Sequence, residues 1–123
     1  MKKVFVAIPP KYDLNDDELR AFAHQVEKAA HKAEIILNEY VEIISVADLS
    51  HLRNNNVNDR KEHVRAFLFQ SMQSMFYADL AVFAGNWESS PECKFLRNAA
   101  VAIDVPVIFV DTFDIKETEN ENE

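Results

Sequence analysis

Residues 80–110, LAVFAGNWESSPECKFLRNAAVAIDVPVIFV, decide the fold of this chain. The unbroken apolar run at residues 80–84 is typical of a parallel strand that is buried on both faces. Ser90 and Pro91 then predict the start of a helix, with serine as the N-cap and proline at the first helical position. A second apolar strand is predicted at residues 106–110. We therefore expect a strand–helix–strand unit, and such α/β units bind their ligands at the carboxyl ends of the strands.

The chain before this unit follows the same alternation of strands and helices. A first strand is predicted at residues 4–8, and it ends at Pro9 and Pro10 because proline cannot donate to a β ladder. A long helix is predicted from Asn15, with Glu18 at the capping-box position and one apolar stripe along its length. The loop after the first strand is therefore expected at the same edge of the sheet as the loop of the unit above.

One more strand and one more helix are predicted before residue 80. The strand covers residues 41–46, a polar segment at 47–58 follows it, and the helix begins after Asp59 with Glu62 at the capping-box position. Its apolar stripe is expected to lie in the core and consists of Val64, Phe67, Leu68, Met72, Met75 and Phe76. Its start is basic and holds Arg60, Lys61, His63 and Arg65. Positive charge there opposes the helix dipole and is unfavourable unless an anion lies nearby.

These elements predict the architecture. With right-handed crossovers, the order β-α-β-α-β-α-β gives a three-layer α/β/α sandwich around a parallel sheet of about four strands. We assign residues 1–111 to a single domain. Residues 112–123 hold five acidic residues and one lysine, so their net charge is −4. We expect this acidic segment to be a frayed tail.

The composition of the 123 residues argues against several classes of function. A net charge of −8 at pH 7 argues against direct binding of nucleic acid or of an anionic membrane. The single glycine excludes glycine-rich phosphate loops. The single cysteine, Cys93, fits a reducing cytoplasm, and we expect it to be a buried apolar residue. No apolar run approaches the roughly 20 residues of a membrane helix, and no residues have metal-ligand spacing, so we expect no membrane, metal or cofactor.

Four segments carry a family resemblance. They are Ile8-Pro9-Pro10, Ala78-Asp79, Gly85-Asn86-Trp87-Glu88-Ser89-Ser90-Pro91, and the alanine-rich helix that leads to Val105-Pro106-Val107-Ile108. Together they resemble the nucleoside 2-deoxyribosyltransferase-like superfamily, in particular its branch of small phage and bacterial proteins. The element order agrees over almost the whole chain, whereas the specific motif covers residues 78–107. The resemblance implies a flavodoxin-like or Rossmann-like fold, a pocket for a nucleoside or nucleotide, and a homo-oligomer.

The resemblance also identifies a departure at the catalytic position. Family members cleave or exchange N-glycosidic bonds with a helix glutamate that attacks the anomeric carbon of the sugar. Counted from Trp87, that glutamate falls on Leu96 and the family's histidine on Arg97. Leucine cannot act as a nucleophile. Glu92 lies one turn earlier on the same helical face, about 5 Å along the axis, and is either a relocated carboxylate or a first-turn acid that favours the helix dipole.

The residues expected to line the ligand site follow the first and third strands. They are Ile8, Pro9, Pro10, Lys11, Tyr12, Gly85, Asn86, Trp87, Glu88, Ser89 and Ser90. Ser89, Ser90 and the N–H groups of the helix start form an anion site, or Ser90 is a simple N-cap. Trp87 stacks on a base or at a subunit interface, or it folds back over the edge of the sheet.

The remaining candidates also allow two interpretations each. Lys11 and Tyr12 supply a phosphate contact and a stacking ring, or Lys11 is a solvated surface residue. Asn86 hydrogen-bonds a sugar hydroxyl, or it follows glycine as part of a turn. Glu88 would repel a phosphate, which argues against tight binding of an anion.

Three functions follow from these features. The first is a nucleoside- or nucleotide-binding protein without catalysis. The second is an N-glycosidase or deoxyribosyltransferase that acts on a nucleoside or nucleoside monophosphate through Glu92 or Glu88. The third is a protein-interaction module without a small ligand. The retained loop beside a missing nucleophile favours the first.

Overall fold

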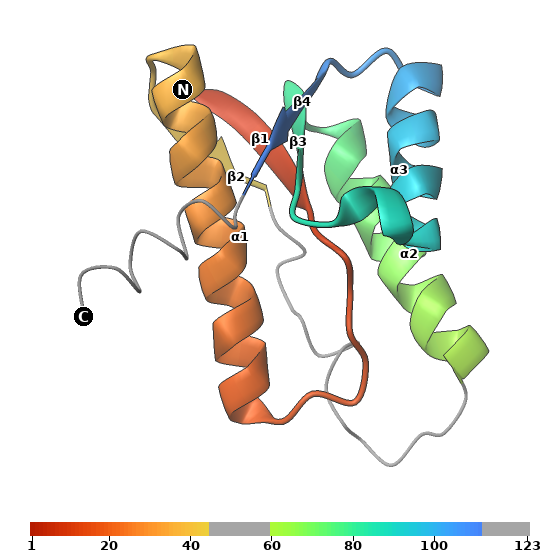
Figure 1. The fold of residues 1–123 in the computed structure, drawn as a ribbon. Helices are drawn as coiled ribbons and strands as arrows, with labels where there is room; N and C mark the ends of the chain where they lie inside the picture. Colours follow the sequence, from red (N-terminus) through yellow and green to blue (C-terminus); the bar gives the residue numbers. More distant parts are fainter. Residues whose placement is uncertain (45–59, 112–123) are drawn as a thin grey trace.

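A computed structural model describes residues 1–44 and 60–111 of the chain (Figure 1). The elements are β1 (Lys2–Ala7), α1 (Asp16–Leu37), β2 (Val41–Ile43), α2 (Arg60–Phe76), β3 (Leu80–Ala84), the 3-10 turn η2 (Trp87–Ser89), α3 (Pro91–Ala102) and β4 (Val107–Val110). The strands form one parallel sheet in the order β2-β1-β3-β4. The predicted small α/β fold with a four-stranded parallel sheet is therefore confirmed.

The sheet separates two cores because successive side chains of a strand point to opposite faces. Phe5 and Phe83 belong to the core under α2 and α3, whereas Val4 and Val82 belong to the core under α1. Figure 1 shows α1 on one side of the sheet and the other two helices on the opposite side. The central strand β3 is buried along its whole length, as its unbroken apolar run predicted.

Local signals in the sequence fix the long helix α1. The side chain of Asn15 accepts a hydrogen bond from the N–H of Glu18 at 2.9 Å, and the Glu18 carboxylate accepts one from the N–H of Asn15 at 3.1 Å. The predicted capping box is therefore present. The helix ends at Leu37, and the C-cap residue Asn38 has a φ of 56°, in the left-handed region that asparagine tolerates.

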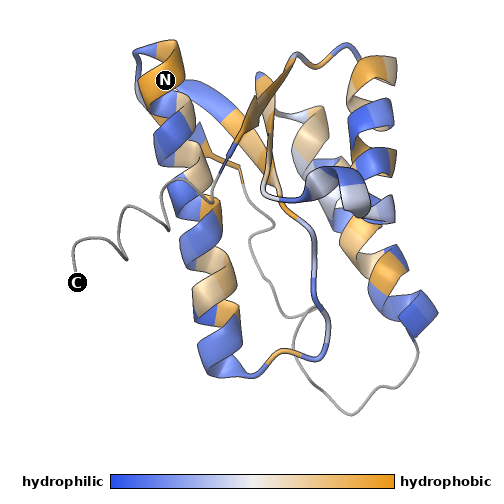
Figure 2. Cartoon of the chain, in the orientation of Figure 1, coloured by the Kyte–Doolittle hydropathy of each residue, from blue (hydrophilic) through white to orange (hydrophobic). Residues whose placement is uncertain are grey.

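The predicted core stripe of α2 is wrong at one position. The buried residues of this helix recur every four positions, at His63, Phe67, Ser71 and Met75. Phe76 is one residue further, about 100° around the helix, and its side chain is 61% exposed. Figure 2 shows hydrophobic colouring along the central strands and mixed colouring on the helices.

Some predicted features lie outside the described residues. They are the strand residues after Ile44, the polar segment at 47–58, the cap at Asp59 and the acidic segment at 112–123. Within the part of the chain that the structure covers, no helix is both long and apolar enough to cross a membrane.

Candidate ligand-binding site at the carboxyl edge of the sheet

The loop after β1 and the start of α3 meet at the carboxyl edge of the sheet. The hydroxyl of Tyr12 donates a hydrogen bond to Oε2 of Glu92, with an oxygen–oxygen distance of 2.8 Å. These residues are 80 positions apart, and they meet because β1 and β3 are hydrogen-bonded neighbours. Glu92 is buried, with 7% of its surface exposed. A carboxylate this buried requires partners, and Tyr12 supplies one of the roughly four hydrogen bonds that it can accept.

The turn after β3 fixes where Glu92 lies. Gly85 has a φ of 66°, which glycine adopts without steric cost, and it turns the chain out of the strand. Ser90 then accepts a hydrogen bond from the N–H of Cys93 at 3.2 Å, and Pro91 begins the helix. Both predictions for the helix start are confirmed. Glu92 consequently occupies the first turn, where the helix dipole favours a carboxylate.

The start of α2 completes the group of polar side chains around Tyr12. The His63 ring stacks on the Tyr12 ring, with centroids 5.7 Å apart and planes inclined by 30°. Nε2 of His63 lies 3.8 Å from Oδ1 of Asp13, and the Arg60 guanidinium lies over the Tyr12 ring, 5.7 Å from its centroid. We call these five residues, Tyr12, Asp13, Arg60, His63 and Glu92, the edge cluster. They come from three separate elements of the chain.

Electrostatics keeps the central phenol neutral. Burial, followed by the hydrogen bond to Glu92 and its negative charge, raises the pKa of Tyr12 well above its ordinary value. Tyr12 therefore remains a hydrogen-bond donor at all physiological pH values.

Asp13 has a φ of 61°, and aspartate is among the residues that tolerate this left-handed conformation. The edge cluster thus combines two carboxylates, an imidazole and a guanidinium around one ring.

Three members of the edge cluster, Asp13, Arg60 and His63, were not among the residues predicted to line the ligand site. One signal for them was present, because the basic start of α2 opposes the helix dipole unless an anion is close. The structure places the carboxylate of Asp13 near His63. The sequence alone could not predict that the loop after β1 lies close to the start of α2.

Trp87 packs against the protein itself. Its ring stacks on Phe109 with a centroid distance of 4.9 Å and meets Phe83 edge-on at 5.7 Å. The indole therefore folds back over the edge strand β4, which was one of the two interpretations. One face of the ring is covered by Phe109, so only the other face can contact a ligand.

The predicted ligand-binding residues differ in how exposed they are to a ligand in solvent. Ser90 is buried and caps α3, and Ile8 is buried in the core under α1. Asn86 closes the 3-10 turn, since its carbonyl accepts hydrogen bonds from the N–H and the hydroxyl of Ser89. Exposed residues of the set are Lys11, Asn86, Glu88 and Ser89, while Pro9, Pro10, Gly85 and Trp87 are half-buried. Among the predicted ligand-binding residues, Tyr12 forms a direct hydrogen bond to Glu92 in α3.

Two side chains of α3, those of Cys93 and Leu96, lie in the hydrophobic core. Leu96, at the position that the resemblance assigns to a glutamate, is fully buried in the core under α2 and α3. Cys93 is also fully buried, as predicted, and burial raises the pKa of its thiol to about 11. A thiol that stays protonated at neutral pH is a poor nucleophile.

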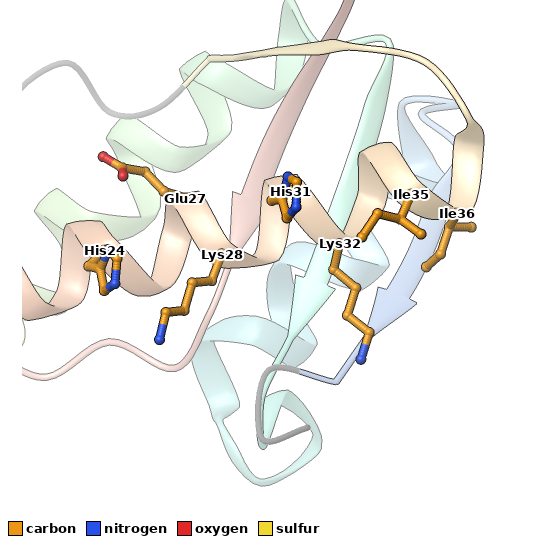
Figure 3. A pocket seen from close by; sticks show the side chains of 7 residues that line it. All are labelled: His24, Glu27, Lys28, His31, Lys32, Ile35 and Ile36. Atoms are coloured by element: carbon orange, nitrogen blue, oxygen red, sulfur yellow. The ribbon is translucent and has the colours of Figure 1, made fainter. Parts of the chain in front are cut away.

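A concave feature runs along the solvent-facing side of α1. It has a volume of about 420 Å³ and is lined by His24, Glu27, Lys28, His31, Lys32, Ile35 and Ile36. Figure 3 shows that these side chains follow one another along a single helix and that Glu27 points away from the two lysines. The hollow does not bring together side chains from different elements. Ligand sites need polar groups that converge, so the edge cluster is the better candidate.

Comparison with known protein families, with curated proteins and with solved structures finds no match for this chain. Among the residues that the structure describes, no three His, Cys, Asp or Glu side chains are grouped to hold a metal ion.

Proposed function

We propose that this chain binds a nucleoside or a nucleotide at the edge cluster. The observation that carries the proposal is the buried Glu92 carboxylate, held by Tyr12 at the carboxyl edge of the sheet. This edge is where open α/β sheets bind ligands. The class of ligand comes from the resemblance to the nucleoside 2-deoxyribosyltransferase-like superfamily. We also propose that the protein works in the cytoplasm, because its single cysteine, Cys93, fits a reducing compartment.

The chemistry of the edge cluster suits such a ligand. A carboxylate accepts hydrogen bonds from the hydroxyl groups of a sugar or the amino group of a base, and aromatic rings stack on a base. Glu92 supplies the carboxylate, and the half-buried Tyr12 supplies a ring. The buried Leu96 supports binding rather than cleavage at the family's catalytic position, because an aliphatic core residue cannot attack a sugar.

The proposal is tested by thermal unfolding of the full chain with a panel of nucleosides and nucleoside monophosphates. A ligand at about 100 times its Kd stabilises the folded state by roughly 2.7 kcal/mol, so we expect a clear rise in Tm for at least one compound. Glu92→Gln is expected to abolish this rise. Glu88→Gln is the matched control, because Glu88 is an exposed acid in the turn η2 that precedes α3. If no compound on the panel stabilises the wild-type chain, the proposal fails.

A second candidate function is cleavage of the N-glycosidic bond through Glu92. The observation that favours it is the same buried carboxylate, oriented by a phenol. An oxygen of Glu92 would form a bond to the anomeric carbon while the bond to the base breaks and the base takes up a proton. Water would then hydrolyse the glycosyl ester. Release of free base by the wild-type chain, lost in Glu92→Gln and kept in Glu88→Gln, would establish this activity.

We also propose a homo-oligomer, which the resemblance implies. Exposed aromatic residues on the outer side of α2 support it, since Phe69 and Phe76 are 66% and 61% exposed and share one helical face. Sedimentation of the full chain tests this. A mass above that of one chain, reduced by Phe69→Glu, is the expected result, and a monomer at all concentrations would reject it.

A further inference from the structure

We infer that the ligand of the edge cluster carries a phosphate, which Arg60 binds, so that the chain prefers a nucleoside monophosphate to the nucleoside. This inference rests on the proposed function and narrows its ligand. It assigns a role to a residue that the family motif does not include.

The position of Arg60 is the first observation. Arg60 is the first residue of α2, and its guanidinium lies over the face of the Tyr12 ring. The hydroxyl of the same ring points to Glu92. A single phenol ring thus has a carboxylate at its hydroxyl end and a guanidinium over its face. The inferred ligand contacts Glu92 through its sugar or base and contacts Arg60 through a group attached to the sugar.

The charges around Arg60 are the second observation. Its side chain is exposed, and among the described residues no carboxylate forms an ion pair with it. The neighbouring acid, Asp13, instead faces His63. A cation at a helix start is unfavourable on its own, because it opposes the positive end of the helix dipole. An anion that binds beside Arg60 interacts favourably with both the guanidinium and the dipole.

The chemistry of the guanidinium selects phosphate among the groups of a nucleotide. Arginine presents parallel N–H donors that match two phosphate oxygens, and it remains charged at all physiological pH values. Lys11 is a second exposed cation on the loop that holds Tyr12. These cations are needed, because a chain with a net charge of −8 otherwise repels a phosphate.

The experiment compares matched ligand pairs by calorimetric titration of the full chain. Each 2′-deoxynucleoside is measured beside its own 5′-monophosphate, in the wild type, in Arg60→Ala and in Arg65→Ala. Arg65 is the matched control, since it is an exposed arginine on the outer side of the same helix. We expect the monophosphate to bind the wild type about tenfold more tightly than the nucleoside, the factor that one charge-assisted hydrogen bond supplies. Arg60→Ala is expected to reduce this ratio to about twofold, whereas Arg65→Ala leaves it unchanged.

The other outcomes separate the two claims. If the nucleoside and its monophosphate bind the wild type equally well, the phosphate inference is wrong and the proposed function stands. If Arg65→Ala lowers the ratio as much as Arg60→Ala does, the preference reflects general electrostatics, and the assignment to Arg60 is wrong. If neither ligand binds, the proposed function fails, and the inference fails with it. Arg60→Ala is expected to fold, because removing a cation from a helix start relieves an unfavourable interaction.

Discussion

At the scale of single residues, the Tyr12–Glu92 hydrogen bond connects the loop after β1 to the first turn of α3. This hydrogen bond contributes to the stability of the folded state because Glu92 is buried. A buried carboxylate that loses a hydrogen-bond donor still carries the free-energy cost of its desolvation. Tyr12→Phe removes this donor and retains the ring. We expect a loss of about 1–3 kcal/mol in the free energy of unfolding, measured by chemical denaturation. Tyr40→Phe, at an exposed tyrosine, is the control, and an equal effect of both changes would contradict the account.

The thiol of Cys93 makes stability depend on pH in the alkaline range. The unfolded thiol loses its proton near 9.0, whereas burial keeps the folded thiol protonated up to about 11. The contribution is therefore complete below pH 9 and is lost as the pH rises through about 11, by at most ~1.4 kcal/mol per pH unit. Cys93→Ala should flatten the decline of unfolding free energy between pH 9 and 11. Because Tyr12 titrates in both proteins, the difference between the two curves isolates the thiol, and parallel curves would refute this.

Ser71 is a buried polar residue of α2. Its hydroxyl, on the inner face of α2, has no partner among the described residues. A buried unsatisfied group costs about 1–3 kcal/mol, and alanine also favours the helix. We expect Ser71→Ala to raise the free energy of unfolding by about 1 kcal/mol. Ser74→Ala on the same helix measures the helix-propensity part alone, so a gain no larger than that of Ser74→Ala would argue against the unsatisfied hydroxyl.

At the scale of elements, the start of α3 decides between a cap and an anion site. Ser90 is buried and caps the helix through the N–H of Cys93, whereas Ser89 is exposed and bonds the carbonyl of Asn86. Ser90→Ala should lower the free energy of unfolding by about 1 kcal/mol and leave ligand affinity unchanged. Ser89→Ala is the control and should cost less. Unchanged stability of Ser90→Ala, together with lost binding of a monophosphate, would restore the anion-site interpretation.

The sequence predicted well those features that depend on neighbouring residues. The capping box at Asn15 and the Ser90–Pro91 start need only residues a few positions apart, and the run at residues 80–84 reports its burial directly. The sequence-based predictions were wrong or incomplete where a feature depends on the rotation of a helix about its axis or on the distance between segments far apart in the sequence. Phe76 is one position away from the inward face of α2, and no local pattern reports that rotation.

The candidate site was predicted in part for the same reason. Parallel strand order placed the loops after β1 and β3 at one edge, so the general location follows from topology. The approach of Arg60 and His63 to Tyr12 depends on how α2 packs against β1, which no motif in the sequence encodes. The packing of Trp87 on Phe109 likewise required the position of the edge strand.

At the scale of the whole molecule, residues 1–44 and 60–111 contain two candidate places for a ligand. The edge cluster joins three elements around Tyr12, and the hollow along α1 is lined by one helix. The two places lie on different parts of the fold. The edge cluster uses the starts of α2 and α3, which cover one face of the sheet, whereas α1 covers the opposite face. A measurement that locates a bound ligand therefore distinguishes them.

The most direct test of the central claim is an NMR titration of the full chain with a 2′-deoxynucleoside 5′-monophosphate. Backbone amide shifts locate the contact without assuming any activity. The account predicts that the largest changes fall on Tyr12, Asp13, Arg60 and Glu92, and that Glu92→Gln removes them. Changes concentrated on α1 between His24 and Ile36, or no saturable change at any amide, would contradict the assignment of the ligand to the carboxyl edge of the sheet.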